Sequence, residues 1–387
     1  MKKIVCFLMS VLFTASLASC GGNEKIDYKP ITGVDAIFDD SIGYNNEDPS
    51  VMQIDEYTRY VYYTRNQEKF GDFANSIWVR KGVFDGEKYV YGKAKQVLTT
   101  SESGWDSRYT YAPTVIKGDF TYNGATYRYL MAYAGSKNKA NLNNSQIGLA
   151  VGNSADGEFI KVGNAPIVEY DVYDWDVSGM ASVKGASDPS LVSYDLKSKV
   201  MLFYSFYSPT VSISERVLEL DLSKDLNTLT SYNVLEGLLV NTSGIRDSSM
   251  APTFLGADFA YDQANDTLYS VRDYYEIATE APFVAEAVQI VKGSFLRAVY
   301  EIPSFDNEVE IWTTINDKIN AIDTGIVDDE NRFNGYDRIY SAGIVRDAFG
   351  RTFYEDKIEI IYTSVATADT TKDYAYSAML HSFTQEL

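Results

Sequence analysis

The sequence contains very few of the residues that form disulfides and metal sites. Its 387 residues include two cysteines and one histidine. Cys6 and Cys20 both lie near the N-terminus, so we expect the folded part of the chain to contain neither a disulfide nor a cysteine metal site. A single histidine, His381, excludes an ordinary Ser-His-Asp triad, histidine-rich zinc sites and HExxH chemistry. No glycine-rich phosphate loop follows a predicted strand, and we therefore predict no cofactor and no metal.

Positive charge is also scarce. The chain has 34 Lys and Arg residues against 54 Asp and Glu, which gives a formal net charge of −20. An acidic surface repels phosphate backbones, so nucleic acid is not an expected partner. Neutral or cationic ligands suit it better. The 31 Tyr and 19 Phe residues favour strands, and some of them could form stacking faces for sugars.

The first residues resemble a processing signal. Lys2 and Lys3 precede an apolar run at 4–17, which is too short to span a bilayer. Leu-Ala-Ser-Cys at 17–20 has the form of a bacterial lipobox. We predict that residues 1–19 are removed and that 20–40 form a tether lipidated at Cys20, which anchors the protein in the bacterial cell envelope, at the outer membrane. The alternative is an ordinary secretory signal with a chance cysteine.

One phrase recurs five times in the rest of the chain: a small or acidic residue, usually a proline, an apolar strand and a Tyr-rich partner strand. The copies start at Asp48, Ala112, Asp188, Ala251 and Ala342. Such self-similarity indicates one repeated supersecondary unit. We predict a single all-β domain over 41–387, a five-bladed β-propeller, in which radial repetition protects the sheet edges. The five starts are then expected to converge on one central funnel.

Turn and helix signals support this reading. Asn123-Gly124 and Asp85-Gly86 lie between apolar runs and are typical of tight hairpins. Residues 276–291 are the best helical candidate, although Pro282 interrupts them. The long gap before the fifth copy predicts an insertion or a long hairpin at 293–312.

Several stretches carry a family resemblance. The sequence resembles the five-bladed glycosidases of glycoside hydrolase family 43 and its relatives, such as arabinanases and β-xylosidases. The matching stretches are Glu-Asp-Pro-Ser-Val at 47–51, Tyr-Thr-Tyr-Ala-Pro-Thr-Val at 109–115, 146–159, Ser-Asp-Pro-Ser-Leu at 187–191 and Ile-Val-Arg-Asp-Ala-Phe-Gly-Arg at 344–351.

The resemblance implies roles for individual residues. Asp48 corresponds to the catalytic base, and Asp188 to the carboxylate that tunes and orients the general acid. The family's acid is a Glu in a fourth-blade Glu-Gly-Pro, where this sequence has Met250-Ala-Pro. The last blade usually has a His that helps to bind a central ion or water, and Ser341 stands at that place.

Inverting glycoside hydrolysis needs a base and an acid carboxyl about 6.5–9.5 Å apart. Asp48 can supply the base. Glu276 is the first candidate for a relocated acid, and Glu236 and Glu280 are others near the fourth blade. The alternative for each Asp-Pro-Ser is structural, because Asp at a strand start often accepts local backbone N–H groups.

Further residues are candidates for contacts with a sugar. An Arg beside an Asp is also often a structural ion pair, and both readings stay open for Arg246 and Arg346. The candidate substrate-binding residues are Trp105, Arg108, Tyr111, Trp175, Arg246 and Arg346.

Three functions are compatible with these residues. The first is a lipoprotein that recognises an oligosaccharide or polysaccharide, with weak or lost hydrolase activity. The second is an active inverting arabinosidase- or xylosidase-like enzyme with a relocated acid. The third is a protein-binding scaffold. Asp48 with Asp188 favours the first two, Met250 favours the first over the second, and an exposed apolar patch would favour the third.

Overall fold

A computed structural model gives the fold. It describes residues 37, 44–66, 75–138, 144–170, 185–208, 212–245, 254–274, 287–302, 310–316, 318–320, 338–365 and 378–387. All of them belong to the compact unit Ile31–Leu387, and the other unit, Met1–Pro30, lies outside the described residues. The predicted signal segment and Cys20 are therefore outside them as well.

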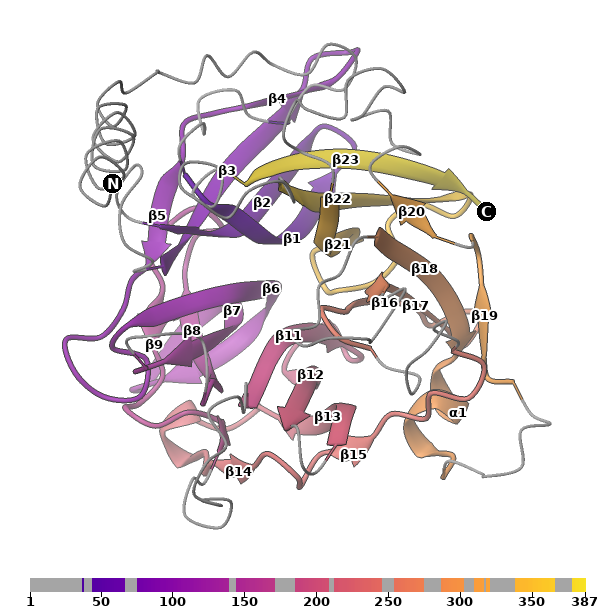
Figure 1. Cartoon of the computed structure of the whole chain (residues 1–387). Helices are drawn as coiled ribbons and strands as arrows, with labels where there is room; N and C mark the ends of the chain where they lie inside the picture. Colours follow the sequence, from indigo (N-terminus) through magenta and orange to yellow (C-terminus); the bar gives the residue numbers. More distant parts are fainter. Residues whose placement is uncertain are drawn as a thin grey trace, which may run out of the picture. The chain divides into compact units, whose positions relative to one another are not determined.

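Five blades are arranged around a common centre (Figure 1), and the predicted five-bladed propeller is confirmed. The first blade consists of β1 (Asn46–Asp55), β2 (Thr58–Asn66), β3 (Asn75–Phe84), β4 (Tyr89–Tyr91) and β5 (Lys95–Leu98). The second consists of β6 (Tyr109–Tyr122), β7 (Ala125–Ser136), β8 (Gln146–Gly152), β9 (Ile160–Lys161) and β10 (Val168–Glu169). The third consists of β11 (Gly185–Ser193), β12 (Lys199–Ser208), β13 (Ser212–Asp221) and β15 (Leu238–Leu239).

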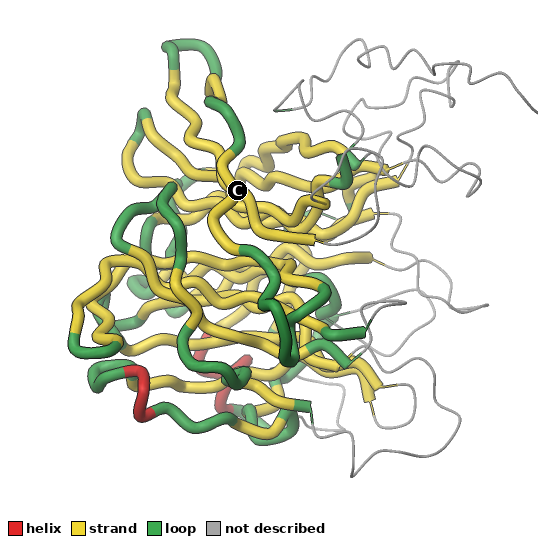
Figure 2. Tube along the Cα trace, turned by 90° about the vertical axis from the view of Figure 1, so that its left-hand side faces the viewer, coloured by secondary structure: helices red, strands yellow, loops and turns green. Residues whose placement is uncertain are grey.

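The last two blades complete the ring. The fourth consists of β16 (Asp258–Asp262), β17 (Thr267–Tyr274), β18 (Ala287–Ser294), β19 (Trp312–Thr314) and β20 (Ile319–Asn320). The fifth consists of β21 (Arg338–Asp347), β22 (Lys357–Val365) and β23 (Met379–Glu386). Between blades, β14 (Tyr232–Asn233) pairs in parallel with β10. Helical structure in the described residues is limited to α1 (Phe295–Tyr300) and a short 3-10 helix, Leu226–Thr228; Figure 2 shows how far strands predominate.

Hairpins connect neighbouring strands within each blade. Asn123 and Gly124 join β6 to β7 with φ values of 52° and 73°. Two consecutive positive φ angles match the twist of a two-residue hairpin, so this predicted turn is confirmed. Among the described residues, no helix has the length and apolar character needed to cross a membrane.

The apolar core lies between neighbouring blades. Five clusters of buried side chains each draw mainly on two adjacent blades. Phe203 of β12 and Phe259 of β16, for example, stack with their ring centroids 4.4 Å apart. Burying a side chain of this kind contributes roughly 1.5–3 kcal/mol. Each blade therefore depends on its neighbours, and the inner strands are held around a fixed centre.

The ring closes between the fifth and first blades. Inner strands β21 and β1 pair in parallel and join the two blades into one eight-stranded sheet. Arg59 of β2 also donates to both carboxylate oxygens of Glu359 in β22, at 2.6 and 3.0 Å. Bidentate pairs of this kind have fixed geometry.

Two predicted positions are wrong. The inner strand of the fourth blade begins at Asp258, whereas Ala251, the predicted start, lies outside the described residues. The predicted helix at 276–291 does not form over its last part, because residues 287–291 belong to β18. A helix, α1, follows instead within 293–312, where Ser294 caps it by accepting the Arg297 N–H at 3.3 Å.

Candidate functional site

A β-bulge opens the inner strand of each blade. In four blades the pairing with the second strand skips two residues, at Asp48, Ala112, Asp188 and Ser341 and the residue after each. These four residues have positive φ angles, of 51°, 46°, 51° and 44°. In the fourth blade, Gly256 takes the same place with a φ of 59°. The Asp273 N–H donates to the Leu255 carbonyl on one side of Gly256, and Asp258 pairs with Val271 on the other.

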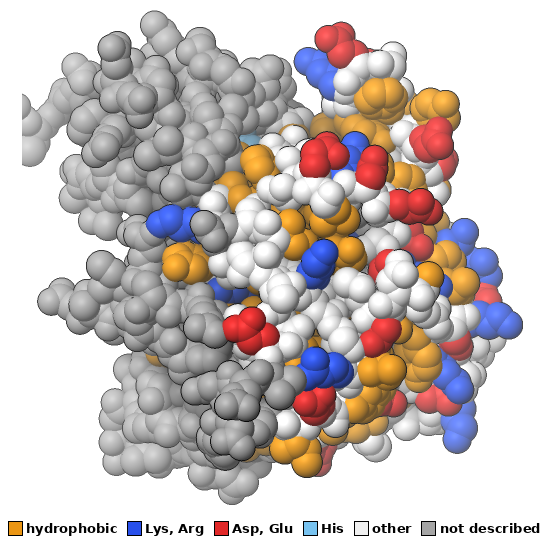
Figure 3. Space-filling view, turned by 90° about the vertical axis from the view of Figure 1, so that its right-hand side faces the viewer, with side chains coloured by type: hydrophobic (Ala, Val, Ile, Leu, Met, Phe, Trp, Pro, Cys, Tyr) orange, Lys and Arg blue, Asp and Glu red, His pale blue; other side chains and the backbone are white. Residues whose placement is uncertain are grey.

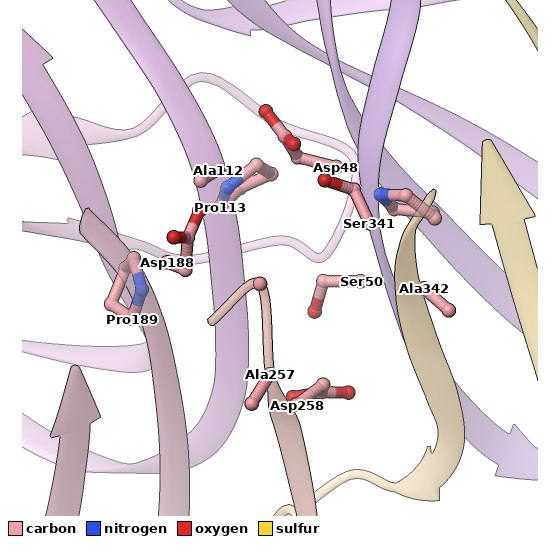
Figure 4. A pocket seen from close by; sticks show the side chains of 12 residues that line it. Asp48, Ser50, Ala112, Pro113, Asp188, Pro189, Ala257, Asp258, Ser341 and Ala342 are labelled. Carbon is pink, nitrogen blue, oxygen red and sulfur yellow. The ribbon is translucent and has the colours of Figure 1, made fainter. Parts of the chain in front are cut away.

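The five bulges meet at one pocket of about 340 Å³, a volume that includes open solvent. Asp48 and Asp188, predicted from their shared phrase to face one funnel, both line it, and Asp258 is a third carboxylate in the wall (Figure 4). The remaining lining is made of small residues, prolines and backbone from the five inner strands. Tyr and Trp were also expected here, and that prediction is wrong for the described part of the lining.

Hydroxyl groups hold the two predicted carboxylates. Thr64 Oγ1 donates to Asp48 Oδ2 at 2.9 Å and accepts the Ala112 N–H at 2.9 Å. Ser187 Oγ donates to Asp188 Oδ2 at 2.8 Å. Thr64 thus connects the Asp48 carboxylate to the bulge of the next blade, and the two carboxylates have defined orientations.

Backbone strain is concentrated around this pocket. Asp tolerates positive φ better than most residues, but a non-glycine residue held in this region still has a cost of order 1–3 kcal/mol. Four such residues, Asp48, Ala112, Asp188 and Ser341, line the same hollow. Strain that clusters in this way is typical of a functional site.

The floor of the pocket is built around Arg346, which is 1% exposed. Its guanidinium contacts the side chain two residues after the bulge start in four blades, and also two backbone carbonyls. Nη1 donates to Ser190 Oγ (3.0 Å), Leu191 O (3.2 Å) and Phe259 O (2.9 Å) and pairs with Asp258 Oδ1 (3.1 Å), while Nη2 donates to Thr114 Oγ1 (3.0 Å) and Ser50 Oγ (3.4 Å).

This geometry corrects the predicted role of Arg346. Both Nη groups of Arg346 donate to protein atoms, while its Nε is buried without a hydrogen-bond partner, and Arg346 does not belong to the pocket lining. It is therefore a structural hub rather than a sugar contact. In the fifth blade the corresponding position is Gly343, where a Cβ would lie 2.1 Å from the Pro49 carbonyl oxygen. Only glycine fits that approach of strand to strand.

The structure also shifts the position that corresponds to the general acid of the family the sequence resembles. Since Gly256 starts the fourth bulge, the residue before it, Leu255, takes the place that the sequence pattern assigned to Met250. Leu255 is 7% exposed and apolar. Met250 lies outside the described residues, as do Glu276, Trp175 and Arg246. The correction changes the residue but not the chemistry, because neither side chain can donate a proton.

Three predicted sugar contacts lie outside the pocket lining. The Trp105 ring stacks on Tyr133 with centroids 5.6 Å apart. Tyr111 is 2% exposed, and its hydroxyl donates to Ser145 Oγ at 2.5 Å. Arg108 is half-buried, with its guanidinium 5.8 Å from the Tyr109 ring centroid. The structure does not bring these side chains to Asp48 and Asp188.

Besides Asp258 in the pocket wall, the sequence reasoning missed a second acidic residue. Glu215 of β13 is 1% exposed and lies near Asp188 in the third blade. Burial raises its pKa well above the usual range, and the charge of Asp188 adds to the effect. The available signal was strand alternation, since Val217, the next residue on the same side of β13, is fully buried. Within the described ranges, no group of three or more His, Cys, Asp or Glu side chains is placed to hold a metal ion.

Comparison with solved structures identifies the fold. The chain is similar to a family 117 glycoside hydrolase from Zobellia galactanivorans, with a TM-score of 0.50, 11% identity and coverage of 92% of this chain and 87% of that one. It is similar to an α-L-arabinofuranosidase from Lactobacillus brevis, with a TM-score of 0.51, 12% identity and coverage of 90% of this chain and 92% of that one. It is also similar to the GH43_1 enzyme from Xanthomonas citri complexed with xylotriose. The TM-score is 0.50 and the identity 13%, with coverage of 92% of this chain and 90% of that one. The fold is therefore that of the five-bladed glycosidase propellers. No protein-family model matches the sequence, and no curated protein matches it significantly.

Proposed function

We propose that this protein recognises a glycan in the central pocket and hydrolyses ordinary arabinoside and xyloside linkages weakly or not at all. One observation carries the proposal. Asp48 and Asp188 line one pocket, while the fourth blade offers Leu255 at the place where the family it resembles has its acid. The fold likeness supports a sugar ligand, because one similar structure holds xylotriose.

The chemistry of the wall suits uncharged sugars. Carboxylates accept strong hydrogen bonds from hydroxyl groups, and sugars present several hydroxyls at once. Asp48 and Asp188 come from different blades, so they can hold two parts of one ring or of neighbouring rings. Acid catalysis typically contributes about 10²–10⁴-fold to such reactions. Without it, a sugar with a poor leaving group stays bound rather than cleaved.

Calorimetric titration with neutral xylo- and arabino-oligosaccharides tests the proposal. Asp48→Asn and Asp188→Asn each keep the side-chain shape but remove the charge, and we expect each to weaken binding by about tenfold or more. Asp119→Asn is the matched control, because Asp119 pairs with Arg128 on the surface. Wild-type protein that binds none of these sugars, or binding to both pocket variants that is as strong as binding to the wild type, would contradict the proposal.

We further propose that the protein is lipid-anchored through Cys20 in the bacterial cell envelope, at the outer membrane. The support is the sequence Leu-Ala-Ser-Cys at 17–20, behind a short apolar run. Mass spectrometry of membrane-fraction protein tests it. An acylated N-terminal Cys20 is expected, and an unmodified Cys20 in that fraction would rule the anchor out.

A further inference from the structure

Glu215 lies in the same cross-strand row as the residue beside Asp188. Glu215 of β13 pairs with Ser205 of β12, and Ser205 pairs with Ser187 of β11. Directly paired residues project from the same face of a sheet. Ser187 precedes Asp188 and donates to its carboxylate at 2.8 Å. The row therefore leads from the pocket wall into the interior of the third blade.

The surroundings of Glu215 contain little that could neutralise a charge. Its Oε2 accepts the Ser205 hydroxyl at 3.0 Å, whereas its Oε1 is buried without a hydrogen-bond partner. On the side of the fourth blade, the nearest polar contact of Ser205 is the Phe254 carbonyl, at 3.1 Å. Next to β15, the Val240 N–H donates to the Glu215 backbone carbonyl rather than to the Glu215 carboxyl group.

The one cation beside Glu215 in sequence points away from it. Successive side chains of a strand project to opposite faces, and Arg216 donates to the carbonyls of Leu235 and Gly237 at 2.8 and 2.9 Å. Among the described residues, Asp188 is the charged group that acts on Glu215. A negative charge near a buried carboxyl group makes ionisation of that group less favourable.

We propose that Glu215 is a positioning residue for Asp188: it stays protonated behind the pocket wall, so that the pair carries a single negative charge, on the oxygen atoms that face the ligand. This inference rests on the proposed glycan-binding function for its purpose. The protonation state itself is a property of the protein alone. Burial raises the pKa of Glu215, and a neutral carboxyl needs no buried counter-ion.

A protonated Glu215 near Asp188 predicts a specific pH dependence of glycan binding. Ionisation of Glu215 would place a second negative charge near Asp188. Glycan affinity should then fall as pH rises through the pKa of Glu215, by up to about tenfold per pH unit if only the protonated form binds. Asp48 comes from another blade and is not among the groups whose charge raises the pKa of Glu215.

Carboxyl ¹³C NMR titration of the full chain tests the pairing without any ligand. Glu215 is expected to titrate well above an ordinary Glu in the wild type, at a lower pH in Asp188→Asn, and at the wild-type pH in Asp48→Asn. Xylotriose affinity measured from pH 5 to 9 tests the purpose. The alkaline fall expected in the wild type should be absent in Glu215→Gln, whatever the affinity of that variant at neutral pH.

The NMR titration and the affinity measurement distinguish failure of the proposed function from failure of the proposed role of Glu215. If no xylotriose binds but Glu215 titrates as expected, the proposed function fails and the proton pairing stands. The pairing is overturned if Glu215 titrates in the ordinary range, or if Asp48→Asn shifts it as much as Asp188→Asn. The positioning role is overturned if Glu215→Gln shows the same alkaline fall as the wild type.

Discussion

Neighbouring residues at the start of each inner strand have different roles. In Asp-Pro-Ser, the aspartate occupies the strained bulge and lines the pocket, as Asp48 and Asp188 do. The serine two positions later, Ser50 or Ser190, contacts Arg346 beneath the pocket. The phrase therefore combines a functional residue with a structural one, and the repeated Ser or Thr follows from the hub rather than from a ligand.

Relief of the strain at Ser341 should stabilise the fold. Ser341 has a φ of 44°, and glycine accepts this angle without steric penalty. We expect Ser341→Gly to raise the free energy of unfolding by about 1 kcal/mol, measured in urea. Ala342→Gly is the matched control and should lower it, since its φ is not positive and its buried side chain is lost. Destabilisation by Ser341→Gly would show that the angle is not strained.

Glu215 should make stability fall with rising pH. Burial raises its folded pKa, so the stabilising contribution of the protonated form is complete below the unfolded pKa and is lost as pH rises through the folded one. Relative to Glu215→Gln, the wild type should lose up to about 1.4 kcal/mol per pH unit in that window. Urea unfolding from pH 4 to 9 measures this. A difference between the two proteins that does not change with pH would contradict it.

At the scale of elements, the inner strands are joined into a ring by side chains as well as by packing. Thr114 accepts the Leu191 N–H, Ser190 accepts the Phe259 N–H, and Asp258 accepts the Ile344 N–H, at 3.2, 3.1 and 2.9 Å. Each bond runs from one blade to the next. Arg346 contacts all three of these side chains, so the positions of the strands that carry Asp48 and Asp188 depend on it.

Loss of the hub should therefore be costly. Arg346→Met keeps the length of the side chain but leaves Asp258 without its buried cation, and breaking a buried pair destabilises by roughly 3–5 kcal/mol. Arg128→Met provides the control, because its pair with Asp119 is exposed on both sides and contributes at most about 1 kcal/mol. Thermal or urea unfolding of both variants compares them. Equal losses would mean that Arg346 is not a hub.

The recurring sequence pattern predicted the start of some inner strands correctly and that of the fourth blade wrongly, for a physical reason. Blades one, two and three carry proline in the bulge, after Asp48, Ala112 and Asp188. The fourth carries Gly256-Ala-Asp, without proline, and Ala-Pro-Thr at 251–253 imitates the pattern just upstream. Local chemistry alone could not separate the imitation from the strand.

The roles of Arg346 and Glu215 could not be predicted from sequence. The partners of Arg346 come from four other strands, far apart in the chain, and only the ring brings them together. Glu215 acquires its surroundings from the pairing register of β13, β12 and β11, which no local pattern specifies. Asp48 and Asp188 were recoverable because both follow from one repeated phrase.

At the scale of the whole molecule, an acidic chain presents an acidic pocket. The formal charge is −20, and the described lining holds Asp48, Asp188 and Asp258 without a Lys or Arg. The face in Figure 3 mixes acidic, basic and apolar side chains. Asp258 is paired with Arg346 beneath the pocket, and the acidic lining favours neutral or cationic ligands over acidic ones.

Hydrolysis of a panel of natural arabino- and xylo-oligosaccharides, beside activated aryl glycosides, tests the central claim most directly. A missing acid slows departure of poor leaving groups most. We expect little or no turnover of the natural linkages by the wild type, a smaller deficit for the aryl glycosides, and retained binding of both. Robust wild-type turnover of natural linkages that disappears in Asp48→Asn would contradict the account. It would identify an inverting enzyme with a relocated acid, for which Glu276 is the first residue to replace.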